Sequence, residues 1–197
     1  MALHSGMTPG SYFAAYKTAI DQMEITGGQG RPLSLDEGMT AAIDLVTSLK
    51  GGGKAMVIGN GGSAAIASHL HNDLCKAVRV RAMVFNEQPL LTALANDDGY
   101  HTVFQTPLQL WADKGDLLIA VSSSGESDNI IRAAALAADK GCRVLTFTGF
   151  KPANRLRAMG DVNIYVPSLE YGYVEMAHSV IAHCMTDLTI ARMAARV

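Results

Sequence analysis

Hydrophobic and polar positions along the chain follow two patterns that alternate from residue 55 onward. Short, largely apolar runs predict strands, and five such runs occur: Ala55–Ile58, Ala82–Phe85, Leu117–Val121, Arg143–Thr148 and Val162–Val166. Continuous apolar runs of this kind are typical of parallel strands in a sheet that is covered on both faces. The pattern therefore predicts a buried parallel sheet.

Segments with a helical spacing of apolar residues separate these strands. The predicted helices cover Ser63–Lys76, roughly Pro89–Ala95, roughly Val103–Trp111, Ser127–Lys140, a short stretch near Asn154–Met159 and a long final segment, Val174–Ala195. The alternation of strand and helix predicts an α/β fold, a three-layer, doubly wound, five-stranded parallel sheet. In such sheets ligands bind beyond the carboxyl ends of the strands.

Two further helices are predicted before the first strand, over Ser11–Met23 and Ser34–Leu49. The Gly/Pro-rich segment Thr26–Leu33 separates them and reads as a linker. We therefore expect additional N-terminal helices over residues 1–50 and a domain over residues 51–197, within one structural unit. The leading helices have no sheet of their own to cover, which favours a role in an oligomer interface.

The composition is that of a globular protein without the charge pattern of a nucleic-acid-binding or membrane protein. The 197 residues are 49% hydrophobic, enough for one substantial core, and the formal net charge of −2 with no Lys/Arg block argues against nucleic acid and membrane partners. Cys75, Cys142 and Cys184 have no C-x-x-C spacing, which favours reduced thiols. Met1–Gly10 lacks the pattern of a secretory leader, and no run of about 18 apolar residues occurs. We expect a soluble, cytoplasmic protein.

The most informative segment runs from Met56 to Asp73. An apolar strand leads into Gly59-Asn60-Gly61-Gly62-Ser63, and a helix is predicted to start at Ser63. Glycines let the backbone approach an anion closely, and the free N–H groups and dipole of the helix's first turn favour negative charge there. This loop is therefore predicted to bind phosphate.

A second loop of the same kind follows the strand Leu117–Val121. Its sequence, Ser122-Ser123-Ser124-Gly125-Glu126-Ser127, brings four hydroxyl groups and a glycine to a strand-to-helix turn. Neither loop matches the Walker A or the G-x-G-x-x-G pattern, and hydroxyls and amides without a lysine suit a single sugar phosphate. The alternative is that Ser127 only caps a helix and the other serines form a turn.

Acid–base and metal-binding groups follow the first loop. His69 and Asp73 are four residues apart and so share one helix face, as expected of a proton-transfer pair or a metal site. Alternatively, Asp73 pairs with Lys76 and His69 is a satisfied helical histidine. His71 points elsewhere and is interpreted as structural.

The two loops, with Ala95-Asn96-Asp97 between them, resemble the sugar isomerase (SIS) domain family, and within it the phosphoheptose isomerases, over about Ser34 to Ala195. The resemblance implies that a sugar phosphate is the ligand and that zinc is a cofactor. It also implies which residues bind the phosphate and the sugar: Asn60, Gly61, Gly62, Ser63, Asn96, Asp97, Ser122, Ser123, Ser124 and Ser127.

By the same resemblance, Asp73 is the catalytic base and His183 its acid/base partner, while His69, Asp73, Glu175 and His183 hold the zinc. Two positions depart from the family pattern, which has Glu at 73 and Gln at 175. The shorter Asp73 sets its carboxylate back by roughly 1–1.5 Å, and Glu175 adds a carboxylate that favours a divalent cation. Glu175 and His183 are about 12 Å apart along an ideal helix. His178, which lies between them in the sequence, is an alternative metal ligand, or it donates a hydrogen bond to a metal ligand.

We therefore expect an aldose–ketose isomerase that converts sedoheptulose 7-phosphate to glycero-manno-heptose 7-phosphate, or acts on a close relative, through an enediol. The resemblance further implies a homotetramer with active sites between subunits. One alternative is a non-catalytic SIS protein that binds a sugar phosphate or acts as an adaptor. A lyase or epimerase is another, because the enediol also serves those reactions.

Overall fold

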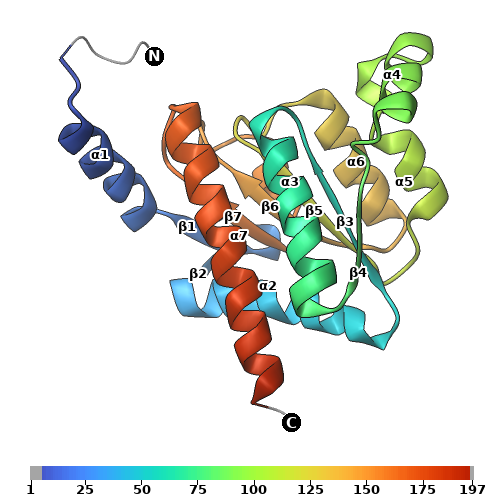
Figure 1. Ribbon diagram of the computed structural model, residues 1–197, viewed down its shortest axis with the longest axis horizontal. Helices are drawn as coiled ribbons and strands as arrows, with labels where there is room; N and C mark the ends of the chain where they lie inside the picture. Colours follow the sequence, from blue (N-terminus) through green and yellow to red (C-terminus); the bar gives the residue numbers. More distant parts are fainter. Residues whose placement is uncertain (1–5, 196–197) are drawn as a thin grey trace.

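The structure, a computed structural model, describes residues 6–195, so the first residues, where a leader was predicted to be absent, lie outside it. A seven-stranded sheet forms the centre and helices cover both of its faces (Figure 1). The strands are β1 Glu24–Gly27, β2 Pro32–Leu33, β3 Lys54–Gly59, β4 Arg81–Val84, β5 Leu117–Ser122, β6 Arg143–Thr148 and β7 Val162–Tyr165. The main helices are α1 Pro9–Asp21, α2 Leu35–Ser48, α3 Gly62–Asp73, α4 Gln88–Asp97, α5 Gln105–Trp111, α6 Asp128–Asp139 and α7 Tyr171–Ala194.

The predicted five-stranded parallel sheet is confirmed as the core of this larger sheet. The strand order is β2-β1-β7-β6-β5-β3-β4, and all pairs from β7 to β4 are parallel. Successive residues of each strand face opposite sides. Val57 and Ile119 belong to the hydrophobic cluster under α2, α3 and α7, whereas Met56 and Leu118 belong to the cluster under α4, α5 and α6. Two apolar layers thus enclose the sheet.

The interpretation of Thr26–Leu33 as a linker is wrong, and so is the expectation that two helices precede the first strand. β1 pairs antiparallel with β7, with Ile25 opposite Ile164, and β2 pairs antiparallel with β1. Gly38 of α2 gives Ile25 room, because a Cβ there would collide with the Ile25 side chain. The sheet therefore extends by two antiparallel strands beyond the parallel core.

The two leading helices differ in how they pack. Ala42 and Val46 of α2 are fully buried, and they belong to the same hydrophobic cluster as the sheet. On α1, by contrast, only Ala19 is buried and Phe13 is 66% exposed. Figure 1 shows α1 reaching away from the body beside the start of α7. α2 is thus part of the core, whereas α1 packs against it only at its edge, through Tyr12, Tyr16 and Ile20, and leaves Phe13 exposed. No helix within residues 6–195 combines the length and apolarity needed to cross a bilayer.

His178 anchors α7 to the end of β6. Its side chain is fully buried, and Nε2 lies 3.1 Å from the carbonyl oxygen of Thr148, which as an acceptor requires Nε2 to carry the proton. Nδ1 is buried without a partner within residues 6–195. Burial lowers the pKa of His178 to about 4, because the charged form is poorly solvated there. The histidine is therefore neutral and structural at pH 7.

This depressed pKa predicts a loss of stability in mild acid. Unfolded His178 takes up a proton below about pH 6.5 and the folded form only near pH 4, so the unfolded state binds more protons in between. The free energy of unfolding should therefore fall by about 2 kcal/mol from this group between pH 7 and pH 4.5. Urea unfolding at both pH values should show that His178→Gln loses this component. The control His101→Gln, at an exposed histidine, should show the same fall in the free energy of unfolding as the wild type. An equal fall between pH 7 and pH 4.5 in all three proteins would contradict the assignment to His178.

Candidate active site

The two predicted phosphate loops meet because β3 and β5 are parallel neighbours, so both carboxyl ends lie at one edge of the sheet. Together they form a pocket of about 110 Å³. Its walls come from the two loops and from the start of α7: Asn60, Ser63, Ser122, Ser123, Ser124, Ser127, Tyr171 and Glu175. The structure thus gathers six of the predicted phosphate and sugar ligands in one cavity.

Glycines shape both loops. Gly61, at φ 56° and ψ −123°, turns the chain from β3 into α3, which starts at Gly62, one residue before the prediction. A side chain is strained in this conformation, so the turn requires glycine. Gly125 has a φ of 64°, and a Cβ there would collide with the side chain of Asn154. Gly61 therefore permits the turn into α3, and Gly125 permits the close packing of the second loop against Asn154.

The serine hydroxyls of the second loop have different roles. Ser122 Oγ accepts a hydrogen bond from the Gly125 N–H at 3.2 Å, and Ser124 Oγ accepts one from the Glu126 N–H at 3.2 Å. Ser123 Oγ is buried and has no partner within residues 6–195. A buried hydroxyl normally has a partner, so Ser123 Oγ is available to bond a molecule in the pocket that it lines.

The alternative that Ser127 is only a helix cap is not supported. Ser127 occupies the N-cap position of α6, yet its hydroxyl makes no capping hydrogen bond and lines the pocket instead. The first N–H groups of α6 and α3 both lie next to the same cavity, so two helix N-termini contribute positive potential to it. These groups suit a phosphoryl dianion.

Asn60 is held by partners that sequence reasoning missed. Its side-chain amide exchanges two hydrogen bonds with Asn129, at 3.0 and 2.9 Å, and Tyr100 donates its hydroxyl to Asn60 Oδ1 at 3.0 Å. Asn129 follows Ser127 by two residues, so its place in the first turn of α6 was a usable signal. The sequence contains no comparable signal for Tyr100 or for the pocket residue Tyr171, because only the tertiary fold brings these two residues to the site.

Asn96 and Asp97 are not among the pocket residues. They lie at the carboxyl end of α4, both exposed, and Asn96 Nδ2 donates to Asp97 Oδ1 at 2.7 Å. Their predicted contact with the sugar therefore stays a prediction.

A second group of functional side chains lies at the end of α3. Asp73 Oδ2 is 3.4 Å from His69 Nε2 and 3.5 Å from His183 Nδ1 of α7, and the two imidazole rings are 4.8 Å apart. Asp73 is half-buried, whereas the side chains of His69 and His183 are 58% and 50% exposed. A π-helical turn, Leu74–Val78, follows directly, a feature frequent at functional sites.

These three residues can hold a metal ion. One donor atom from each of His69, Asp73 and His183 lies within 4.8 Å of the others. Two imidazoles and one carboxylate are a donor set that zinc accepts, and catalytic zinc sites keep a fourth position open for water or substrate. The structure brings His69, Asp73 and His183 together, and their joint role as zinc ligands stays a prediction. The alternative pairing of Asp73 with Lys76 is not seen among the described residues.

Glu175 does not join this group within the described chain. It lines the phosphate pocket, and its carboxylate lies so close to Gly62 that a Cβ at that glycine would collide with it. Glu175 lies more than two helical turns from His183 on α7, and its side chain turns toward Gly62 rather than toward the trio. Of the four predicted zinc ligands, the fold thus assembles three.

Comparison with known proteins agrees with this geometry. The sequence profile of the SIS domain family matches residues 34–149. A phosphoheptose isomerase of Pelobacter propionicus is 35% identical over 153 residues, which cover 75% of this chain and 80% of that protein. The phosphoheptose isomerase of Escherichia fergusonii is 32% identical over 160 residues, 78% of this chain and 83% of its own.

Solved structures give the same result for the fold. The phosphoheptose isomerase GmhA from Neisseria gonorrhoeae superposes with a TM-score of 0.81 at 27% identity, covering 92% of this chain and 96% of its own. A phosphoheptose isomerase from Francisella tularensis gives a TM-score of 0.79, also at 27% identity, covering 94% of this chain and 100% of its own. With a family match over more than half of its length and relatives above 30% identity, the chain belongs to the SIS domain family, in the group of the phosphoheptose isomerases.

Proposed function

We propose that this protein is an aldose–ketose isomerase that converts sedoheptulose 7-phosphate to glycero-manno-heptose 7-phosphate, or acts on a close relative. The observation that carries the proposal is that α3 and α7 each contribute to two sites. Ser63 and Glu175 line the phosphate pocket, while Asp73 and His183 form the acid–base group. One substrate can therefore be anchored at its phosphate and react at its other end.

The reaction moves a proton between two adjacent carbons through an enediol. The phosphate pocket orients the open-chain sugar, so that carbons 1 and 2 lie by Asp73. Asp73 takes a proton from carbon 1 of the ketose, this proton exchanges with solvent at the enediol stage, and Asp73 then delivers a proton to carbon 2. His183 moves a proton between the two oxygens. Asn72 Nδ2 donates to Asp73 Oδ1 at 3.1 Å, which leaves Oδ2 for the substrate side.

Zinc is the proposed cofactor, with His69, Asp73 and His183 as its ligands. When bound, it would polarise the sugar carbonyl as a Lewis acid. The intact trio favours an enzyme over a non-catalytic adaptor, since an adaptor has no use for an acid–base group.

We further propose that the protein is a cytoplasmic homotetramer with its active sites at subunit interfaces. Apolar side chains on the α7 surface support the assembly, because Met176, Val180 and Leu188 are each 46% exposed or more on the helix that carries His183. A second copy covering this face would also shield the exposed imidazoles. The three free cysteines are consistent with a reducing compartment.

Removing zinc tests the proposed cofactor. Dialysis against a chelator should lower the turnover of sedoheptulose 7-phosphate at least about 100-fold, because carbonyl polarisation is lost, and added zinc should restore it. Metal content should be measured beside activity. Full turnover by verified metal-free protein would refute the zinc role and leave the isomerase assignment standing. No turnover of any ketose phosphate by zinc-loaded protein would refute both.

A further inference from the structure

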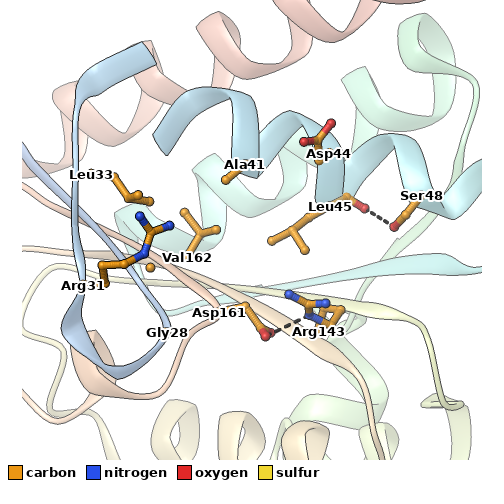
Figure 2. A pocket seen from close by; sticks show the side chains of 11 residues that line it. Gly28, Arg31, Leu33, Ala41, Asp44, Leu45, Ser48, Arg143, Asp161 and Val162 are labelled. Carbon is orange, nitrogen blue, oxygen red and sulfur yellow. Dashed lines mark hydrogen bonds and ion pairs between the residues drawn. The ribbon is translucent and has the colours of Figure 1, made fainter. Parts of the chain in front are cut away.

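A second pocket lies on the opposite edge of the sheet from the phosphate loops, at the amino ends of β6 and β7. Its volume is about 350 Å³, within the range of small-molecule sites. It is lined by the Gly-rich segment after β1, one side of α2 and the first residues of β6 and β7: Gly27, Gly28, Arg31, Leu33, Ala41, Asp44, Leu45, Ser48, Arg143, Asp161 and Val162. Figure 2 shows this arrangement, with Leu45 and Val162 between Arg31 and Arg143 in this view.

Arg31 is fixed beside this pocket by a tight turn. The Gly27 N–H donates to the Arg31 carbonyl oxygen at 2.8 Å, and Gln29 and Gly30 between them have left-handed φ values of 58° and 72°. The guanidinium folds back over Gly27, with Nη2 3.8 Å from where a Cβ would lie. Within residues 6–195 it has neither a side-chain hydrogen bond nor an ion pair. A planar group with five N–H donors is thus available for a ligand, on an exposed side chain that starts from a defined backbone turn.

The other charged groups around the pocket are already paired. Arg143 Nε lies 2.8 Å from Asp161 Oδ1, and Asp161 Oδ2 accepts the Val144 N–H at 2.7 Å. Asp44 Oδ1 lies 2.6 Å from Nη1 of Arg192 on α7. Arg31 therefore carries the one unpaired charge among the described residues that line the pocket, and a single positive charge suits a ligand with a single negative charge.

The floor of the pocket is apolar. Leu45 and Val162 are both buried members of the core, and Ala41 and Leu33 pack against the same cluster. An apolar surface next to a guanidinium that is available for pairing fits a ligand with a compact hydrocarbon body and one planar anionic head. We propose that this pocket binds a small monocarboxylate, with the carboxylate on Arg31 and the hydrocarbon body over Leu45 and Val162.

Titration with pivalate, a compact branched monocarboxylate, tests the proposal in the full-length, zinc-loaded protein. Amide NMR signals of residues 27–33 and 41–48 should shift saturably, with a Kd of about 1 mM for so small a ligand. Arg31→Gln should weaken binding at least about 10-fold, because the charge-assisted pair is lost. Ala41→Phe should abolish it by filling the pocket. The matched control Arg79→Gln, at an exposed arginine outside the pocket, should bind as the wild type does.

A titration with inorganic phosphate is the second part of the experiment. It should shift the signals of residues 122–127 and leave those of residues 27–33 unchanged. Three outcomes would overturn the proposal: no saturable shift with pivalate at residues 27–33, equal pivalate affinity in Arg31→Gln, or phosphate binding at Arg31 in preference to pivalate. None of them bears on the proposed isomerase activity, so the two proposals can fail separately.

Discussion

Replacing Asp73 by Asn is expected to lower kcat/KM for sedoheptulose 7-phosphate at least about 1,000-fold, because an amide cannot take a proton from carbon. Asp73 Oδ2 lies between His69 and His183, so the same change also weakens the proposed zinc site. The side chain keeps its size and its neighbours, so the loss should appear in the chemical step. Steady-state kinetics with zinc in excess and a measured metal content would separate the two effects.

Two further variants sharpen this prediction. Asp73→Glu keeps a carboxylate and should stay within about 10-fold of the wild type, which measures the cost of the shorter side chain. Asp139→Asn, an exposed acid at the end of α6, is the control and should leave the rate unchanged. Retention of more than about a tenth of the activity by Asp73→Asn would show that Asp73 is not the base.

Asp116→Ala is expected to lower the free energy of unfolding by about 3 kcal/mol. The carboxylate is 3% exposed and joins the starts of β3 and β5. Oδ1 accepts the Lys54 N–H at 2.9 Å, Oδ2 accepts the Asp113 N–H at 2.9 Å, and Lys54 Nζ lies 2.5 Å from Oδ2. Its loss leaves two N–H donors without partners and removes one counter-ion of a largely buried lysine.

Urea unfolding at pH 7 and a fixed protein concentration would measure this effect. Asp113→Ala is the matched control, because that acid pairs with the same Lys54 Nζ at 2.7 Å but is 81% exposed. Water and salt screen an exposed ion pair, so the control should be nearly as stable as the wild type. If both variants lost the same stability, the buried position of Asp116 would not explain its contribution.

The parallel strands could be predicted to within about two residues because their burial on both faces leaves a continuous apolar run. β1 escaped prediction for the opposite reason. Its four residues, Glu24 to Gly27, include one large apolar side chain, Ile25. They form a strand only because they pair with β7, which is far away in sequence. The glycines that follow read as linker, although they form the turn that fixes Arg31.

The sequence likewise predicted one part of the candidate site and missed another. Gly and Ser at strand ends were enough to predict that both loops form one site, because those residue types report local backbone requirements. The helical spacing of His69 and Asp73 likewise predicted their contact. Where Glu175 lies depends on how α7 packs against α3, which no local pattern encodes. The sequence therefore predicted it as a metal ligand, whereas it lies in the phosphate pocket.

Deuterium transfer from solvent tests the central claim, proton transfer by Asp73 in an enediol reaction, most directly. Zinc-loaded protein incubated with sedoheptulose 7-phosphate in D₂O should yield the aldose 7-phosphate with deuterium at carbon 2, as seen by NMR and mass spectrometry. Asp73→Asn should yield neither product nor label. Recovery of unchanged, unlabelled ketose from the wild-type protein, or equal labelling by Asp73→Asn, would contradict the account.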